Sequence, residues 1–429
     1  MNYCKRCMYP ENARPTIIFD DDGVCSGCRY HESRSGVNWA EREKMFAALV
    51  EEVKAERGRR GNIYDCIVPV SGGKDSTFQV WLMKEKYGLN PLLVAYNHCF
   101  NTEGGLRNLE NLVMKSGCNL IRYTLNLKSA IKLASYMLKK VGDVTWHYHA
   151  GIMTFPIQTA VKYQIPFIFW GEEGFSELTG MFQLDDFVEF KKWTRKEHDM
   201  RGFEPEDLVN DPDSDIEWND VSAFIYPSDE EIADLDLRGI YVSNYFEWDA
   251  KKQTELVMRE YDFKGVTYEK GRSFVQYSKI DDHANDMHDY LKYLKFGYGR
   301  ATDEVSYEIR HGRMAREEGA AIVRRLDSFE PYAMDEYLKL MDISREEFFA
   351  LVEDARDPEI WEKMDGEWVA RDSVINHVNE DGVDEARVEQ SSDRTFSIAN
   401  RQLYYNEELP PEPTGDPRLD IRKDIFKVL

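Results

Sequence analysis

Long apolar runs and an excess of positive charge are both missing from this chain of 429 residues. No stretch of eighteen or more apolar residues occurs, so we expect no membrane-spanning helix and no membrane contact. The first ten residues, MNYCKRCMYP, lack the apolar core of a secretory signal. Lys and Arg number 55 against 79 Asp and Glu, and the net charge of −24 repels polyanions. These absences predict a cytoplasmic protein with a small-molecule substrate rather than a nucleic acid.

Cysteine is scarce, and its seven residues are not spread like a disulfide framework. Four of them form two Cys-x-x-Cys pairs separated by seventeen residues: Cys4, Cys7, Cys25 and Cys28. This spacing is typical of a structural zinc ribbon, in which four thiolates leave no open coordination position. The alternatives are free or redox-active cysteines and an iron–sulfur cluster. Because residues 1–35 are too few to fold on their own apolar core, we expect zinc to supply the folding free energy.

We expect no metal at the histidine near these ligands or at the three other cysteines. His31 follows the second pair and is interpreted as a surface histidine, because a four-thiolate site needs no fifth ligand. The remaining cysteines, Cys66, Cys99 and Cys118, lie in or beside expected strands and are interpreted as small buried residues.

A strand, a glycine-rich turn and a helix follow one another between residues 64 and 88. Tyr64 to Val70 is an apolar, β-branched run that predicts a buried parallel strand. The sequence SGGKDS occupies residues 71–76, and apolar residues recur at helical spacing from Thr77 to a stop at Gly88. Backbone N–H groups in such a turn, together with a helix N-terminus, bind anions.

This turn differs from the common nucleotide-binding loop, G-x-x-x-x-G-K-[ST]. Val68 stands where the first glycine of that motif should be, and Asp75 follows the lysine in place of Ser or Thr. The pattern S-G-G-x-D-S directly after a strand resembles instead the pyrophosphate loop (PP-loop) of ATP pyrophosphatases, which split ATP into AMP and pyrophosphate. The alternative is an ordinary glycine-rich turn.

Strands alternate with amphipathic helices after the loop. Further strands are expected at 92–96, 120–125 and 166–170, which predicts an α/β fold with a doubly wound parallel sheet. Ligands of such sheets lie beyond the C-terminal strand ends. Residues 71–76, Asn97-His98 and 171–173 all occupy such ends and should converge.

Two histidines, His147 and His149, precede an expected helix near 151–163. A metal pair at this spacing is possible in principle, but we interpret both as packing or substrate contacts.

The rest of the chain is divided by composition. We expect a zinc ribbon at 1–35, an α/β domain at 36–200, an acidic insertion or lid at 201–240, a substrate-binding continuation at 241–330 and a helical region with a polar tail at 331–429. The acidic stretch is interpreted as a solvated insertion, a mobile lid or a partner docking site. Short helices are expected from Glu330 to His377.

Basic residues gather late in this acidic chain, with aromatic residues between them. They are Lys279, Lys295, Arg300, Arg310 and Arg313. One reason for them is an anionic small molecule such as a nucleotide diphosphate. The other is ion pairing with neighbours such as Asp281, Asp282 and Glu308, and the sequence does not decide between the two.

Taken together, several motifs resemble the N-acetyl sugar amidotransferase family of the PP-loop superfamily. The resemblance covers residues 1 to about 330 and includes the cysteine pairs, SGGKDS, the GEEG turn, KFGYGRATD and RHGRMAREE. The family acts in bacterial surface-polysaccharide, LPS O-antigen and nonulosonic-acid pathways. The resemblance implies an adenine nucleotide alpha-hydrolase-like fold and the cofactors ATP, Mg²⁺ and structural Zn²⁺. It also implies that an acetamido oxygen of a nucleotide-linked sugar is adenylated, and that ammonia then displaces AMP to give an acetamidino group.

The resemblance implies a role for each matching residue. Catalytic roles fall to Lys74, Asp75, Lys279 and Arg300, and nucleotide binding to Ser71, Gly72, Gly73, Ser76, Ala95, Tyr96, Gly171 and Glu172. Asp75 is the candidate Mg²⁺ ligand, and Glu172 is a weaker one. Lys295, Arg310 and Arg313 are candidates for binding the substrate phosphates.

Ammonia needs a source, and the chain shows no glutaminase-length region. We therefore expect a separate glutaminase subunit, with a cyclase-like channel protein as a further possible partner. The competing hypotheses are a tRNA thiolase, which shares the loop but needs sulfur chemistry and a basic surface, a non-catalytic nucleotide-binding subunit, and a synthetase with another small acceptor.

Overall fold

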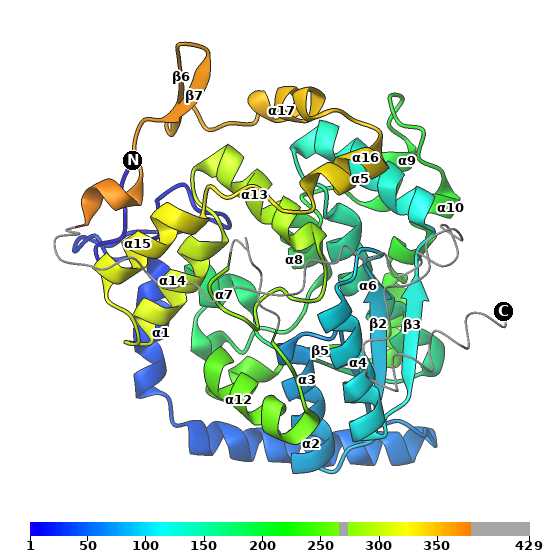
Figure 1. The fold of residues 1–429 in the computed structure, drawn as a ribbon. Helices are drawn as coiled ribbons and strands as arrows, with labels where there is room; N and C mark the ends of the chain where they lie inside the picture. The colour runs from blue at the N-terminus through cyan, green and yellow to red at the C-terminus, as the bar shows by residue number, and fades with distance from the viewer. Residues whose placement is uncertain (266–272, 379–429) are drawn as a thin grey trace.

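The computed structural model describes residues 1–265 and 273–378, and its centre is a parallel sheet (Figure 1). Five strands pair in the order β3-β2-β1-β4-β5. They are β1 Cys66–Pro69, β2 Pro91–Asn97, β3 Leu120–Thr124, β4 Phe167–Trp170 and β5 Arg238–Tyr241. The strand order reverses between β1 and β4, which makes the fold a doubly wound α/β sheet, as the sequence predicts.

Side chains of the central strands are buried on both faces of the sheet, which explains why β1, β2 and β4 are continuous apolar runs. Every residue of β2 is buried. In β1, Cys66 and Val68 pack into one apolar cluster, and Ile67 between them packs into another. The two clusters are the two layers of the core. Cys99 and Cys118 are also buried, as predicted.

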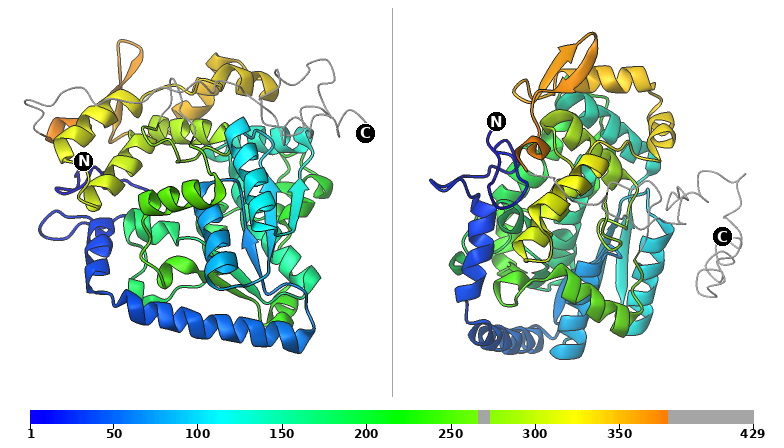
Figure 2. Two further views of the ribbon diagram at one scale, coloured as in Figure 1. Left: turned by 60° about the horizontal axis from the view of Figure 1, so that its bottom comes forward. Right: turned by 60° about the vertical axis from the view of Figure 1, so that its left-hand side comes forward.

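Helices cover both faces of the sheet. One face carries α2 Trp39–Arg60, α3 Lys74–Trp81, α4 Glu103–Ser116 and α12 Ala250–Tyr261. The other carries α6 Trp146–Tyr163 and α11 Asp229–Leu235. The long helix α2 crosses the bottom of the molecule in Figure 1 and in the left view of Figure 2. It begins where the Asn38 side chain accepts a hydrogen bond from the N–H of Glu41 and ends at the left-handed Gly61.

A second, helical part of the core lies above the sheet in Figure 1. It joins α5 Leu127–Val141, α13 Ala284–Phe296, α16 Met334–Met341 and α17 Arg345–Glu353. Next to it, α14 Arg300–Arg310 and α15 Arg316–Leu326 pack on the N-terminal segment with α1 Ser26–Ser33, an arrangement that both views of Figure 2 also show.

The acidic region 201–240 contains more structure than its composition suggests. It holds α9 Pro205–Val209, α10 Trp218–Val221, α11 and most of β5, a strand that the sequence analysis did not predict. Leu208 and Phe224 are fully buried, and the Phe224 ring meets Trp146 edge-on at 5.4 Å. This region is therefore an ordered part of the fold that contributes an edge strand.

Two further expectations need correction. Residues 361–370 form a hairpin of β6 Trp361–Met364 and β7 Glu367–Ala370, not short helices. Its turn, Asp365-Gly366, has positive φ at both residues, as hairpin turns with Asp-Gly require. His147 and His149 lie within the first turn of α6 rather than before it. The remaining helices are α7 Gly174–Thr179 and α8 Lys192–Thr194.

The predicted polar tail, from residue 379 on, lies outside the described residues. Across residues 1–265 and 273–378, every helix is too short or too polar to cross a membrane.

Candidate active site

The SGGKDS sequence forms the turn from β1 into α3, at the C-terminal edge of the sheet. Gly73 precedes α3 and offers no side chain to the free N–H groups of its first turn. The Ser71 hydroxyl accepts a hydrogen bond from Gly73 N at 3.2 Å, and the Ser76 hydroxyl donates to the Gly73 carbonyl at 3.1 Å. The turn is thus held by its own serines, while the start of α3 is left available to an anion.

Gly72 lets this turn approach two other backbones. Its φ of +97° is one that L side chains rarely adopt, and a Cβ there would lie 2.3 Å from the Gly105 carbonyl oxygen in α4. Gly105 in turn lies so close to Asp281 that a Cβ on it would be 2.6 Å from the Asp281 Cα. The two glycines therefore allow the loop, the start of α4 and the segment before α13 to stack at backbone distance.

Replacing Gly72 with Ala is expected to lower the free energy of unfolding by about 2–3 kcal/mol, because both the left-handed φ and the contact with Gly105 must be relieved. Urea unfolding measures this loss. Gly73→Ala is the matched control, because a Cβ there would meet only the Ser71 hydroxyl, at 3.3 Å. Equal stability losses in the two variants would contradict the stacking.

A pair of carboxylates lies beside the loop at the point where the strand order reverses. Asp75 is in the first turn of α3, and Glu172 follows β4. Within the described residues, Asp75 Oδ1 is buried without a hydrogen-bond partner, whereas Oδ2 pairs with Lys74. Burial and the neighbouring Asp75 raise the pKa of Glu172 to about 8. An unpartnered carboxylate oxygen beside a second carboxylate suits a hard cation such as Mg²⁺.

The raised pKa of Glu172 predicts a pH-dependent Mg²⁺ affinity. A carboxyl group with a pKa of about 8 is mostly protonated at pH 7 and mostly ionised at pH 9, and only the ionised form binds a cation. The Mg²⁺ affinity is therefore expected to fall about tenfold from pH 9 to pH 7. Titration of activity against free Mg²⁺ at each pH measures it. Glu172→Gln should remove this dependence, and an unchanged profile in that variant would exclude Glu172.

Lys74 carries the positive charge of the loop. Burial alone would lower the pKa of Lys74, but Asp75 and Glu172 outweigh burial and raise it, so the ammonium group stays charged. Its Nζ lies 5.8 Å from the centre of the Tyr277 ring. A charged ammonium group in this position can neutralise negative charge that develops on a leaving phosphate.

Lys279 and Arg300 lie about 200 residues after the loop in sequence, and the fold brings them to the same site. Lys279 interacts electrostatically with Glu172, Lys74 and Arg300. Arg300 is not a free charge, because it forms a two-pronged ion pair with Asp289 at 2.8 and 2.9 Å. Arg300 thus makes the kind of ion pair that the second alternative expects, with Asp289 as its partner.

Glu304 is a site residue that sequence reasoning missed. It lies one turn after Arg300 on α14, interacts with Lys74 and accepts a hydrogen bond from the Ser273 hydroxyl. Burial raises the pKa of Glu304 to about 8. The i, i+4 spacing of Arg300 and Glu304 places both on one helix face and could have indicated it.

Three predicted phosphate-binding residues lie elsewhere. Lys295 lies at the end of α13, where its Nζ is 3.5 Å from the Val141 carbonyl oxygen. Arg313 is paired with Asp249 and Glu308, as the ion-pairing alternative expects. Arg310 is buried against the cysteine cluster and donates to the Leu178 carbonyl at 3.0 Å.

The residues after β2 converge with the loop through Lys279, as the topology predicts. His98 interacts with Lys279 and Asp281. Ala95 and the Tyr96 ring are buried in the core, and the Tyr96 hydroxyl lies 3.1 Å from His147 Nδ1. His147 is thus a packing residue. The burial of both side chains agrees with the expectation that Ala95 and Tyr96 contact a nucleotide through their backbone.

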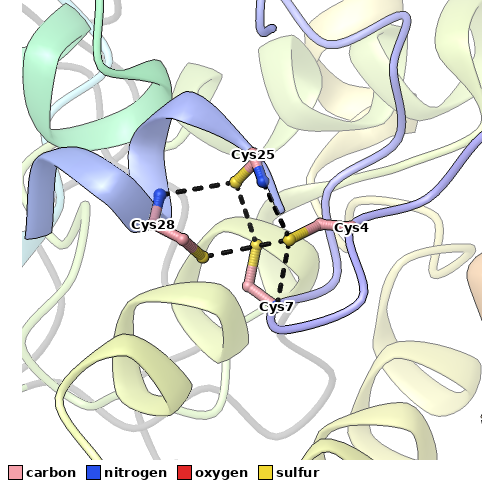
Figure 3. A group of neighbouring side chains, drawn as sticks. All are labelled: Cys4, Cys7, Cys25 and Cys28. Atoms are coloured by element: carbon pink, nitrogen blue, oxygen red, sulfur yellow. Dashed lines mark hydrogen bonds between the residues drawn. The ribbon is translucent and has the colours of Figure 1, made fainter. Parts of the chain in front are cut away.

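The four paired cysteines come together as predicted (Figure 3). The Sγ atoms of Cys4 and Cys28 are 3.9 Å apart, and those of Cys7 and Cys25 are 3.6 Å apart. A tetrahedral site with Zn–S bonds of about 2.3 Å requires about 3.8 Å between sulfurs. All four are buried, and backbone N–H groups point at the sulfurs. The cluster therefore fits Zn²⁺.

Two arginines of RHGRMAREE attach this cluster to the rest of the protein. Arg310 Nη2 lies 3.6 Å from Cys25 Sγ, and Arg316 donates to the carbonyls of Cys4 and Cys7 at 3.0 and 3.2 Å. Positive charge beside thiolates offsets the negative charge of a four-cysteine metal site. Arg310 thus links the cysteine cluster to the end of α7.

Comparisons with known proteins agree with this arrangement in the C-terminal part. Residues 262–374 match the family described as LPS biosynthesis protein WbpG-like, C-terminal domain. An uncharacterized protein of Methanocaldococcus jannaschii is 26% identical over 133 residues, which are 30% of this chain and 46% of that protein. The chain thus spans about half the length of this curated relative.

Among solved structures, the NMN synthetase from Francisella tularensis shares 12% identity and a TM-score of 0.26, covering 52% of this chain and 96% of that chain. A similarity this low bears on neither fold nor function. The range of the family match contains Lys279, Arg300, Glu304 and both arginines at the cysteine cluster. The match of residues 262–374 to the WbpG-like C-terminal domain supports the family resemblance that the motifs indicate.

Proposed function

We propose that this chain is an ATP-dependent enzyme of LPS biosynthesis, and more specifically an N-acetyl sugar amidotransferase that releases AMP and pyrophosphate. One observation carries the proposal: the WbpG-like domain brings Lys279 and Glu304 to the SGGKDS loop, where Lys74, Asp75 and Glu172 already lie. The description of that domain names LPS biosynthesis. In this proposal, the loop and the region that matches the WbpG-like domain act together as one site.

The proposed reaction has two steps. The acetamido oxygen of a nucleotide-linked sugar attacks the α-phosphorus of ATP, and pyrophosphate leaves. Ammonia then adds to the imidate carbon, and AMP departs with the former acetamido oxygen, so an acetamidino group remains. The amide oxygen is a poor leaving group until it is adenylated, which is why the reaction consumes ATP.

The residues of this chain have distinct tasks in that reaction. The turn at 71–76 and the start of α3 hold the β- and γ-phosphates through N–H groups. Asp75 and Glu172 would hold Mg²⁺, which supplies charge to the departing pyrophosphate. Lys74 adds a second positive charge at the same point. Lys279 lies beside them, in reach of the acceptor and the adenylate.

A product assay tests the proposal. Purified protein, ATP, Mg²⁺ and ammonium chloride are incubated with a panel of UDP- and CMP-linked N-acetyl sugars. Mass spectrometry is expected to find AMP and a sugar lighter by the difference between O and NH. With a heavy isotope in the acetamido oxygen, the label should appear in AMP. AMP without label would exclude adenylation at that oxygen.

The assay also separates the competing functions. AMP formation that requires tRNA, with no modified sugar, would favour the thiolase. AMP formation with another small acceptor would favour a different synthetase. No AMP with any acceptor, even with a glutaminase added, would favour a non-catalytic subunit.

The source of ammonia is a separate part of the proposal. We expect the purified chain to use ammonium chloride but not glutamine, and to gain glutamine-dependent activity only when a glutaminase subunit, alone or with a cyclase-like channel protein, is added. Glutamine-dependent turnover by the purified chain alone would contradict this.

A further inference from the structure

Two histidines and a glutamate from three distant parts of the chain meet beside the zinc ribbon. They are His31 in α1, Glu177 in α7 and His311 directly after α14. One possible ligand atom from each residue lies within 4.8 Å of those of the other two. His31 is not the surface histidine that the sequence suggests, because it is half-buried with its ring edge-on to His311 at 4.4 Å.

Each of the two imidazoles has one buried nitrogen whose hydrogen-bonding capacity the described chain does not use. Within the described parts of the chain, His31 Nδ1 and His311 Nε2 are buried and lack a hydrogen-bond partner. Leaving such atoms unpaired is costly, and a bound ion is one common reason for it. Burial also lowers the pKa of His31 to about 4 and that of His311 to about 3, so both rings are neutral at pH 7 and can donate a lone pair.

The other nitrogen of His311 faces a carboxylate. Asp249 Oδ2 lies 4.0 Å from His311 Nδ1, on the side of the ring away from Nε2. Histidines that bind metals generally direct their second nitrogen to a carboxylate or a carbonyl, which fixes the tautomer and the ring orientation. Asp249 is the carboxylate next to His311 Nδ1, at a distance beyond a direct hydrogen bond.

Glu177 supplies a buried carboxylate that is held rigidly. Both of its oxygens accept hydrogen bonds from Arg34 Nη1, each at 3.1 Å. Each carboxylate oxygen has a further lone pair, so Arg34 does not exclude a second partner. Arg34 instead acts as an outer contact that orients the carboxylate.

The charged side chains around the cluster are paired with one another or lie against the cysteine sulfurs. The nearby cations Arg34, Arg313 and Lys252 pair with the carboxylates Glu177, Asp249, Glu308 and Glu247. The fourth nearby cation, Arg310, lies against the sulfurs of the cysteine cluster. With Arg310 included, four cations stand against four carboxylates, so the charged side chains near the cluster are balanced in number.

We infer that His31, Glu177 and His311 form a second metal site that binds a divalent transition metal such as Zn²⁺, separate from the four-cysteine cluster. Two neutral imidazoles and one carboxylate are a ligand set that zinc takes when a fourth position stays open. His31 and His311 also line a cavity of about 930 Å³, together with Trp39 and Arg313. The open position therefore faces the cavity and can take water or an anionic oxygen donor. This inference is independent of the proposed function.

Metal stoichiometry tests the inference in the full chain. The protein is produced in cobalt-supplemented, zinc-depleted medium, dialysed to equilibrium against low-micromolar Co²⁺ and analysed by plasma mass spectrometry. We expect two Co²⁺ per chain. The visible spectrum should contain thiolate charge-transfer bands from the cysteine cluster and weaker ligand-field bands from a nitrogen and oxygen site.

Variants of the two histidines test whether these residues bind the second metal. His31→Gln and His311→Gln should each reduce the content to one Co²⁺ and remove only the ligand-field bands. Unchanged thiolate bands in these variants show that the ribbon is still folded. His198→Gln, at a partly exposed histidine outside the cluster, is the matched control and should keep two. One Co²⁺ in the unaltered protein, or two in His311→Gln, would overturn the inference.

Discussion

Replacing Asp75 with Ala is expected to abolish AMP formation, with a loss of about a thousandfold or more. The physical reason is that Asp75 Oδ1 is a buried carboxylate oxygen without a partner in the described chain, beside a second carboxylate at Glu172. Removing Asp75 takes away the main candidate ligand for Mg²⁺ and also the partner of Lys74. Steady-state measurement of AMP release at saturating ATP and Mg²⁺ checks this result.

Two controls separate loss of chemistry from loss of fold. Asp229→Ala, at an exposed carboxylate in the first turn of α11, should keep full activity. The thermal midpoint of Asp75→Ala should stay close to that of the unaltered protein, because relief of the repulsion between Asp75 and Glu172 offsets the lost ion pair and Lys74 keeps Glu172 as a partner. If the rate of AMP formation falls by less than tenfold, Asp75 does not hold the metal.

Removing zinc from the cysteine cluster is expected to unfold the first 36 residues. Apparent zinc-binding free energies of about 10–16 kcal/mol are comparable with the whole stability of a typical domain, about 5–15 kcal/mol. The sulfurs make up much of the small core of this segment. Hydrogen exchange on protein treated with a strong chelator, or on Cys4→Ser, should show loss of protection throughout residues 1–36.

The loss of structure should extend to α14. Met8 is buried in the cluster formed by α14 and α15, and the Tyr9 hydroxyl donates to Asp303 at 2.8 Å. Since α14 also carries Arg300 and Glu304, the rate of AMP formation should fall when the ribbon unfolds. Cys118→Ser is the matched control: this cysteine is buried outside the cluster, and its loss should cost only about 1 kcal/mol. Full protection of residues 1–36 after zinc removal would contradict a structural role for the metal.

Local patterns were enough to predict the parts of the site that lie in continuous sequence. The SGGKDS turn needs only a strand before it, a helix after it and two glycines, and all of these can be read within 25 residues of sequence. The cysteine pairs are equally local, because zinc ligands recur at short spacing. The strands β1, β2 and β4 are buried on both faces and therefore appear as plain apolar runs.

The elements that were missed lack such a signal. β5 is a four-residue edge strand, RGIY, that follows an acidic stretch, and only pairing with β4 makes it a strand. The hairpin at 361–370 has exposed side chains on most positions, so its alternation is weak. Its Asp-Gly turn was the usable signal.

By itself, the sequence determined the α/β class, the SGGKDS turn between a strand and a helix, the four-cysteine cluster and the family resemblance. Only the tertiary structure decided which charges meet: Arg310 lies at the cysteine sulfurs, Arg300 pairs with Asp289, and Glu304 reaches Lys74. It also placed His31 beside His311. The physical reason is that periodicity reports which face of an element is buried, whereas the partner of a long polar side chain depends on contacts between segments far apart in the chain.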